Sequence, residues 1–411
     1  MRNSTVRIGS AVATCQATHL PRQPGKSLDF LDGLRGLAAL WVMLHHARWL
    51  LWEGWENYGR HPEQYSAAGK ALVLALAPLR YGHQAVLFFF VLSGFVIHLG
   101  HARRLATKPE TARFDWPDYL ARRARRLYPP LVFAMLVTLV LDQIGATQGW
   151  SIYRSATPYA LINTTITPVH DLTTALGNLA FLMGSRVTTW GSNGPLWSLH
   201  FEWWFYMLYP LLWLLSRRSA IAAASAVAVL FALSWVVKPS IGPAHFVARI
   251  FTGLFTWWLG AMLADVYTGR LRIRWSLLAR ASALLVALPV ALPSLASRWP
   301  RLGDGWIPDT LYGIGFAGLF AVCFALRERG WPLTLLGRLK PLGDMSYTLY
   351  VVHMPLLVFF GGWVMSRSPD GTLPQHFGWA FAGALVCMAV AWIAHFAVEK
   401  PFTSRKARPA A

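Results

Sequence analysis

An arginine and two histidines interrupt an apolar stretch near the start of the sequence, LDGLRGLAALWVMLHHARWLL at residues 31–51. Arg35 and His46 are 11 residues apart, and at about 100° per residue of α-helix their side chains point within about 20° of each other. One helix face would therefore carry both, about 16 Å apart along the axis. His45 points about 80° away, so the spacing favours His46 as a reactive imidazole. The alternative is that Arg35 snorkels to the membrane interface and the histidines bond to neighbouring helices.

Four arginines lie within five residues in the stretch YLARRARRLYPP, residues 119–130. Arg123 and Arg126 are three residues apart and would share one face of a helix. Placed beside the Arg35 end of the first apolar stretch, they would form a basic pocket, and arginine forks suit phosphate oxygens. The alternative is that the cluster only sets the orientation of a membrane helix.

A single acidic residue, Glu202, lies in the stretch GPLWSLHFEWWFYMLYP, residues 194–210. It comes seven residues, or about 10 Å of helix, after the start of an apolar segment. A carboxylate at that depth must be paired, protonated or engaged in chemistry, because its charge is costly away from water. His200 points elsewhere on the helix. The alternative is a structural ion pair of Glu202 with Arg48 or Arg249.

A polar stripe runs along the stretch GDMSYTLYVVHMPLL, residues 343–357, in which Ser346, Tyr350 and His353 follow i, i+4, i+7 spacing. Such a stripe on an otherwise apolar helix indicates a side that lines a cavity, or one that packs against a partner helix. We assign these three residues, with Ser93 of the FFFVLSGFVI stretch, to the lining of a cavity. No metal site is predicted.

The composition indicates that membrane helices position these residues. The chain has 411 residues, of which 55% are hydrophobic and only 14% charged, against about a quarter charged in a soluble protein. Apolar runs long enough to cross about 30 Å of hydrocarbon recur along it. The sequence therefore predicts an all-α fold, a polytopic transmembrane helix bundle of about ten spans. The expected spans are 34–52, 80–99, 125–141, 195–216, 219–236, 246–266, 276–293, 310–326, 343–365 and 378–398.

The formal charge of +20 follows the topology of these spans. With the N-terminus in the cytoplasm, the cytoplasmic connections hold 25 Lys and Arg and the opposite ones hold 8, as the positive-inside rule requires. Both termini are then cytoplasmic, and no nucleic-acid partner is needed to explain the charge.

The rest of the chain adds little chemistry. The three cysteines, Cys15, Cys323 and Cys387, give no disulfide framework. Residues 1–27 are expected to be a disordered cytoplasmic tail and 404–411 a basic cytoplasmic tail. In the long connection 142–194, the apolar segment near 175–183 is too short to cross the membrane.

Taken together, these stretches resemble the integral-membrane acyltransferase-3 family, from about residue 28 to 403. The family's motif of Arg, ten residues and His falls on Arg35 and His46. Its Arg-x-x-Arg motif falls on Arg123 and Arg126, although the register of Arg122 and Arg125 competes. The motifs that carry the resemblance are LDGLRGLAALWVMLHH, FFFVLSGFVI, RRARRLYP, PLWSLHFEWWFYMLYP, SYTLYVVHMP and VEKPF.

The resemblance implies an O-acyltransferase domain over residues 28–403, in the plasma (inner) membrane of a bacterium. Its donor would be cytoplasmic acyl-CoA, such as acetyl-CoA, with no tightly bound cofactor. The acceptor would be a hydroxyl of a glycan, a lipid-linked sugar or another small molecule. Some relatives carry a C-terminal extracytoplasmic hydrolase-like domain, which we do not expect here because the sequence ends about eight residues after the last motif.

In this interpretation Arg35, Arg123 and Arg126 hold the CoA phosphates. His46 acts as general base on the acceptor hydroxyl or carries the acyl group itself, and Glu202 orients or charge-balances the imidazole. The rival hypothesis is a transporter or flippase that uses the same buried polar groups to bind a solute or protons.

Overall fold

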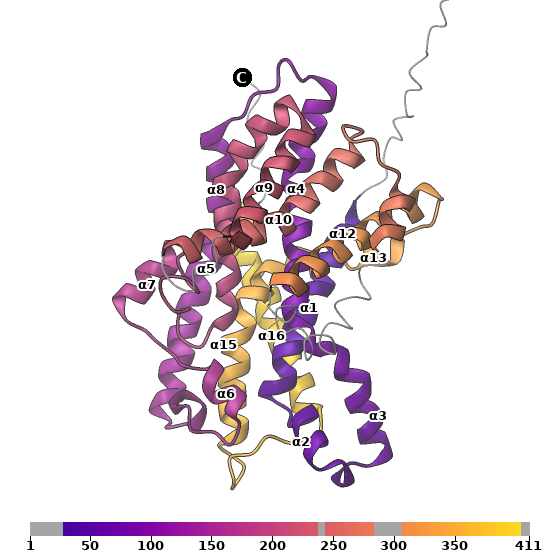
Figure 1. The fold of residues 1–411 in the computed structure, drawn as a ribbon. Helices are drawn as coiled ribbons and strands as arrows, with labels where there is room; N and C mark the ends of the chain where they lie inside the picture. Colours follow the sequence, from indigo (N-terminus) through magenta and orange to yellow (C-terminus); the bar gives the residue numbers. More distant parts are fainter. Residues whose placement is uncertain (1–27, 237–242, 283–305, 404–411) are drawn as a thin grey trace, which may run out of the picture.

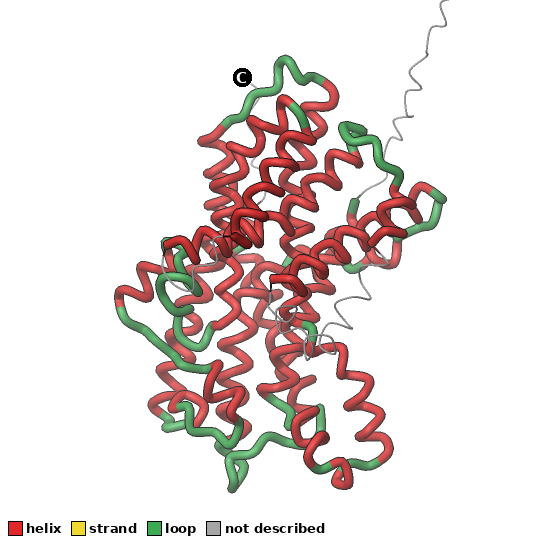
Figure 2. The backbone as a smooth tube through the Cα atoms, viewed as in Figure 1, coloured by secondary structure: helices red, strands yellow, loops and turns green. Residues whose placement is uncertain are grey.

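The computed structural model describes residues 28–236, 243–282 and 306–403, and this part of the chain is mostly helical (Figure 1 and Figure 2). Apart from one isolated bridge between Met183 and Val187, the described residues form no strand. The prediction of an all-α fold is therefore confirmed. The expected tails, 1–27 and 404–411, lie outside the described residues.

Long helices of the described chain coincide with nine of the ten expected spans. They are α1 (Asp29–Leu50), α4 (Gly82–Thr107), α5 (Trp116–Thr147), α8 (Trp197–Arg218), α9 (Ala220–Val236), α10 (Pro243–Tyr267), α12 (Trp306–Glu328), α15 (Ser346–Met365) and α16 (Gly378–Val398). The seventh expected span, 276–293, lies largely outside the described residues, although 275–282 are helical.

Short helices fill the connections. They are α2 (Gly54–Arg60), η1 (Pro62–Gln64), α3 (Ala67–Leu76), η2 (Ala77–Arg80), η3 (Ser151–Arg154), α6 (Ala160–Thr165), α7 (Leu172–Leu179), η4 (Gly194–Leu196), α13 (Thr334–Arg338), α14 (Lys340–Asp344) and α17 (Lys400–Thr403). The eight residues of α7 rise only about 12 Å, so this part of the 142–194 connection does not cross the membrane, as expected.

Within the described residues, six helical segments are long and apolar enough to cross a membrane, as in a multi-pass membrane protein. They are Ala67–Thr107, Trp116–Thr147, Phe246–Tyr267, Ile307–Glu328, Ser346–Met365 and Gly378–Val398. Helix α1 is not among them, and it carries two acidic residues in its first turn and further basic residues along its length. The total of about ten spans and the orientation stay predictions.

The cytoplasmic connection between the expected spans 80–99 and 125–141 is much shorter in the structure. Helix α4 continues to Thr107 and α5 begins at Trp116, which leaves 108–115 as the connection. The side chain of Asp115 caps α5 by accepting a hydrogen bond from the Asp118 amide at 3.1 Å, and Pro117 fits the first turn. The arginine cluster therefore lies on a helix, where spacing decides which side chains share a face.

The central helices approach one another closely through glycines. Helix α10 packs along α4, and a Cβ on Gly260 would lie 1.8 Å from the carbonyl oxygen of Val91. A Cβ on Gly94 would lie 1.9 Å from that of Trp257. Small residues permit such close backbone contact between membrane helices. Helix α15 packs against α1, α5 and α16, and thereby brings the C-terminal part of the chain beside the first helix.

Candidate active site

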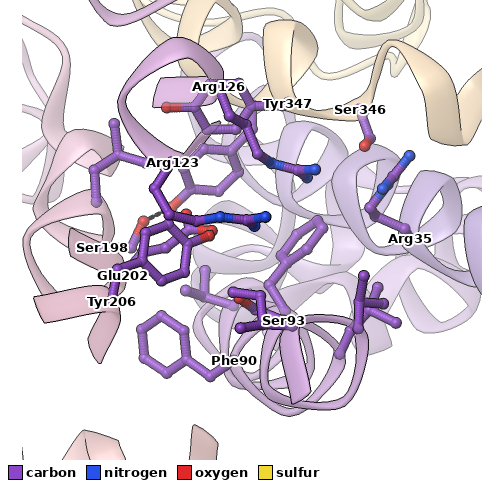
Figure 3. A pocket seen from close by; sticks show the side chains of 17 residues that line it. Arg35, Phe90, Ser93, Arg123, Arg126, Ser198, Glu202, Tyr206, Ser346 and Tyr347 are labelled. Carbon is purple, nitrogen blue, oxygen red and sulfur yellow. Dashed lines mark hydrogen bonds between the residues drawn. The ribbon is translucent and has the colours of Figure 1, made fainter. Parts of the chain in front are cut away.

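One cavity gathers seven of the nine predicted site residues, and we call it the arginine cavity (Figure 3). Side chains of α1, α4, α5, α8 and α15 line it, so five separate parts of the sequence meet there. The predicted residues are Arg35, Ser93, Arg123, Arg126, Glu202, Ser346 and Tyr350. The other lining residues are Val86, Phe89, Phe90, Leu92, Val96, Ile97, Ser198, Leu199, Tyr206 and Tyr347.

The structure distinguishes the two possible registers of the arginine cluster. Arg123 and Arg126 are half-buried and line the arginine cavity (Figure 3). Arg122 and Arg125 are exposed; Arg122 pairs with Asp118, and Arg125 donates to the carbonyl of Ala121 at 3.2 Å. The three-residue spacing therefore places the first pair in the cavity and directs the second pair away from it.

The two cavity arginines have unused hydrogen-bonding capacity. In the described part of the chain, neither Arg123 nor Arg126 makes a side-chain hydrogen bond or an ion pair, and Arg123 Nε is buried without a partner. The Arg123 guanidinium carbon lies 5.6 Å and 5.5 Å from the ring centroids of Tyr119 and Tyr206. Tyrosine faces steady its charge without consuming its N–H donors. Both guanidinium groups can therefore donate to an anionic ligand.

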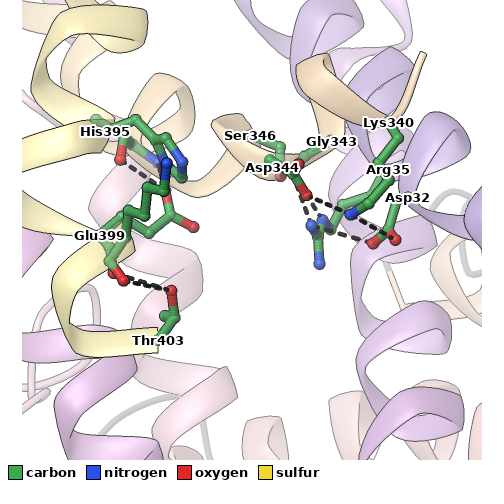
Figure 4. Close-up of polar contacts among 11 residues, drawn as sticks. Asp32, Arg35, Lys340, Gly343, Asp344, Ser346, His395, Glu399 and Thr403 are labelled. Atoms are coloured by element: carbon green, nitrogen blue, oxygen red, sulfur yellow. Dashed lines mark hydrogen bonds and ion pairs between the residues drawn. The ribbon is translucent and has the colours of Figure 1, made fainter. Parts of the chain in front are cut away.

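Arg35 is held at the same cavity by the start of α1. Its Nε and one terminal nitrogen donate to the carbonyl of Gly343 at 3.1 and 2.8 Å, and it pairs with Asp32 at 3.2 Å (Figure 4). A Cβ on Gly36 would lie 2.7 Å from the Gly343 nitrogen. The close approach that glycine permits brings α14 within reach of the guanidinium, which is therefore oriented before any ligand arrives.

A lysine reinforces this end of the cavity wall. Lys340 of α14 pairs with Asp344 at 2.8 Å and with Asp32 at 3.6 Å (Figure 4). The hydrogen bond that Lys340 donates to Asp344 raises the pKa of the lysine above its ordinary value, so the ammonium stays charged at neutral pH. This ion-pair chain links α14 to the first turn of α1.

Glu202 faces the cavity rather than the arginines that the sequence offered as alternative partners. It accepts a short hydrogen bond from the hydroxyl of Tyr206 (Figure 3). Arg249 instead stacks over Phe201 at 5.3 Å and donates to the carbonyl of Gly184 at 3.1 Å. The charge of Glu202 acts electrostatically on Arg126. Glu202 is thus placed beside the basic groups that would hold a donor.

A second carboxylate, which sequence reasoning did not single out, supports the same arginines. Glu399 is buried, and its Oε2 accepts from the amide and hydroxyl of Thr348 at 3.2 and 2.7 Å. His395 Nδ1 lies 3.2 Å from the same oxygen (Figure 4). The charge of Glu399 also acts on Arg35 and Arg126. Its only sequence signal is its place in the VEKPF motif.

The polar stripe of α15 forms one wall of the cavity. Ser346 and Tyr350 line it, and Tyr347, between them, also faces it. The Tyr350 hydroxyl lies 2.7 Å from Ser198 Oγ and 3.0 Å from the carbonyl of Pro195. On α4, Ser93 Oγ accepts from Trp257 Nε1 at 3.2 Å.

His353 differs from the expectation that it lines this cavity, because it is fully buried against His46. The two rings have centroids 5.0 Å apart, and His353 Nε2 lies 3.2 Å from His46 Nδ1. On α15, His353 follows Tyr350 by one helical turn, and these two ring centroids are 5.9 Å apart. The histidine pair therefore adjoins the Tyr350 end of the arginine cavity.

The hydrogen-bond partners assign the tautomers of the pair. His46 Nδ1 lies 2.8 Å from the carbonyl of Val42, and His353 Nδ1 lies 3.1 Å from that of Leu349. A carbonyl oxygen only accepts, so each neutral ring carries its proton on Nδ1. The Nδ1 proton of His46 is then shared between the Val42 carbonyl and His353 Nε2, and among the described residues no group bonds to the lone pair on His46 Nε2. His45 is tied elsewhere, with Nδ1 2.9 Å from the carbonyl of Leu79.

Comparisons with known proteins identify the family of the chain. A family model described as an acyltransferase domain matches residues 28–396. The O-acetyltransferase OatA of Staphylococcus aureus strain NCTC 8325 / PS 47 is 25% identical over 378 residues, which cover 85% of this chain and 53% of the relative. The proteins of the same name from strains COL and MRSA252 match equally. The chain thus spans about half the length of the curated relatives it matches. No solved structure matches.

Proposed function

The chain belongs to this family of membrane acyltransferases, and from that premise we propose that it moves an acyl group from cytoplasmic acyl-CoA to a hydroxyl group. Acetyl is the proposed acyl group, since the matched relatives are O-acetyltransferases. The acceptor is a glycan, a lipid-linked sugar or another small molecule, and the enzyme works in the plasma membrane of a bacterium.

The observation that carries the proposal is the convergence of three arginines from two helices on one cavity. Arg123 and Arg126 have no ion-pair partner in the described chain, and Arg35 is fixed beside them. Each forked guanidinium suits the oxygens of a phosphate, and CoA carries phosphates at one end. In the predicted orientation this end of the helices faces the cytoplasm, where acyl-CoA is made.

The size of the cavity fits the narrow end of the donor. Its volume is about 80 Å³, room for about five to eight waters at roughly 10–15 Å³ for each. The acetyl-thioester end of the pantetheine arm can enter such a space, whereas the rest of the donor stays at the arginine mouth. The thioester then points along α15 toward Tyr350 and the histidine pair.

The free Nε2 of His46 supplies the base. It takes the proton of the acceptor hydroxyl as that oxygen attacks the thioester carbonyl. The tetrahedral intermediate collapses when the C–S bond breaks, and the CoA thiolate leaves with the proton that His46 has carried. His353 Nε2 accepts from His46 Nδ1 and so keeps the lone pair on the reactive nitrogen.

His46 can also act as the acyl carrier. In that sequence Nε2 attacks the thioester, CoA leaves, and the acceptor hydroxyl later displaces the imidazole from the acyl group. Both routes need the same tautomer and the same free nitrogen. They differ in whether an acyl-enzyme accumulates when acyl-CoA is supplied without an acceptor.

One experiment separates this function from the rival transport function. Purified protein in detergent is incubated with acetyl-CoA labelled on the acetyl group, and both binding and CoA release are measured. An acyltransferase binds acetyl-CoA, and an Arg123→Gln, Arg126→Gln double variant loses that binding. A transporter of an unrelated solute leaves acetyl-CoA unbound, and that result would refute the proposal.

A further inference from the structure

A second cavity, which we call the outer cavity, lies where α4, α8, α10 and α12 begin. Its volume is about 620 Å³, within the range of ligand sites. In the predicted orientation these helices start on the extracytoplasmic side, opposite to the starts of α1 and α5 that carry the arginines. The lining of the outer cavity includes His83, Phe90, Trp197, Phe201, Arg249 and Asp309.

The outer cavity adjoins the arginine cavity. Phe90 lines both, and its ring lies 6.0 Å from that of Phe201 in the outer cavity. Trp197 lines the outer cavity, while the next residue, Ser198, bonds to Tyr350 in the arginine cavity. Two ligands, one in each cavity, would therefore be separated from each other by little more than these side chains.

The outer cavity carries groups that suit a sugar ring. His83 Nε2 lies 2.9 and 3.0 Å from the two carboxylate oxygens of Asp309. The His83 ring stacks on Trp197, with centroids 5.4 Å apart and planes 22° from parallel. Flat aromatic faces beside fixed polar groups can pack against the apolar face of a sugar and bond to its hydroxyls.

Arg249 adds a cation that the fold does not neutralise. It stacks over Phe201 and donates one N–H to the carbonyl of Gly184, but it pairs with no carboxylate in the described residues. Asp309 acts on it only electrostatically and makes its ion pair with His83. Arg249 lies in the first turn of the apolar segment Phe246–Tyr267, where a charged group is costly and is therefore a candidate for function. Its unused N–H donors suit a carboxylate or phosphate.

We propose that the outer cavity is the acceptor site and that it binds a sugar bearing an anionic group, which Arg249 recognises. The His83–Asp309 pair and Trp197 hold the ring. This inference rests on the proposed acyltransferase function, for which it names the substrate class and the side of entry. The anionic group is a carboxylate or a phosphate, which share this chemistry.

The test measures the equilibrium binding of sugars to the purified protein in the absence of any donor, with saturation-transfer NMR as the readout. The probes are methyl glucuronide, glucose 1-phosphate and, as the neutral control, methyl glucoside. We expect the anionic sugars to bind more tightly than the neutral one. Arg249→Gln should remove that preference, weakening anionic binding by about tenfold to a hundredfold, as for one charge-assisted hydrogen bond. Comparison of the first two probes tells carboxylate from phosphate.

Matched variants keep the test specific. Arg186→Gln removes an exposed arginine on the same side that stacks over Phe246 outside the cavity, and it should bind sugars like the wild type. Arg249→Lys keeps the charge and should keep the preference for anionic sugars. Unchanged acetyl-CoA affinity in Arg249→Gln shows that the variant is folded.

Three results would overturn the inference: no sugar binding by the wild type, an unchanged preference in Arg249→Gln, or an equal loss in Arg186→Gln. Failure of the acyltransferase function is a separate outcome, because it appears as absent acetyl-CoA binding in the wild type, which the sugar measurement does not involve.

Discussion

Neighbouring arginines on α5 offer a matched pair of substitutions. Arg126 faces the arginine cavity and has no ion-pair partner among the described residues, whereas Arg125 is exposed and donates to the carbonyl of Ala121. Both changes to glutamine remove one positive charge from the same turn of the same helix. If the cavity binds the phosphates of the donor, only the Arg126 change removes a direct contact.

The expected size follows from the chemistry of that contact. A hydrogen bond to a charged group contributes about 1.5–3 kcal/mol, which corresponds to roughly a tenfold to 150-fold change in affinity. Arg126 also offsets the charges of Glu202 and Glu399, and both act on it. Without it these carboxylates repel the phosphates, so we expect Arg126→Gln to fall in the upper part of that range. Arg125→Gln should change affinity less than twofold at physiological salt, because its charge is exposed and screened.

The assay is equilibrium binding of labelled acetyl-CoA to the purified protein in detergent, at low and at physiological salt. Wild type and Arg126→Gln should differ in the slope of affinity against salt, since one phosphate contact is lost. Equal affinities of wild type and Arg126→Gln, or equal losses in the two variants, would refute the placement of the donor.

Two further predictions concern the helix packing and the histidine pair. Gly260→Ala should lower stability by about 1–3 kcal/mol and reduce the thermal unfolding midpoint in detergent, because its Cβ would lie 1.8 Å from the Val91 carbonyl oxygen. Gly100→Ala, whose Cβ meets no atom within 4 Å, should leave the midpoint unchanged or raise it, because alanine favours a helix over glycine; equal midpoints for the two variants would contradict this packing. His353→Ala should slow transfer at least tenfold with unchanged acetyl-CoA affinity, because His46 loses an orienting acceptor; unaltered turnover would exclude that role.

Sequence patterns could predict the helices and the faces that they present. The spacing of Arg123 and Arg126 placed both on one side of a helix, and the structure puts that side in the cavity. The apolar runs identified nine long helices of the described chain. These are local properties, set by the helical repeat and by hydropathy, and a single sequence contains them.

Contacts between helices could not be predicted in the same way. Periodicity says which side of a helix is polar, but it does not say which other helix that side meets. Glu202 was therefore given Arg48 or Arg249 as alternative partners, whereas it bonds to Tyr206 on its own helix. For the same reason His353 was placed in the cavity, although it contacts His46.

The supporting residues escaped prediction because their roles depend on distant segments. Glu399, near the end of the described chain, reaches the start of α15 at Thr348. In the outer cavity, His83 and Asp309 are 226 positions apart and meet through the packing of α4 and α12. No spacing rule connects such positions.

His46 performs the transfer in the proposed mechanism, and its neighbour His45 supplies the matched control. We propose to compare His46→Ala with His45→Gln in inverted membrane vesicles, whose cytoplasmic face is outward, supplied with labelled acetyl-CoA. The measurement is the label incorporated into envelope material, together with the acetyl-CoA affinity of each purified variant. If His46 performs the transfer, His46→Ala binds acetyl-CoA normally but incorporates no label, while His45→Gln retains incorporation. Wild-type incorporation by His46→Ala would contradict it.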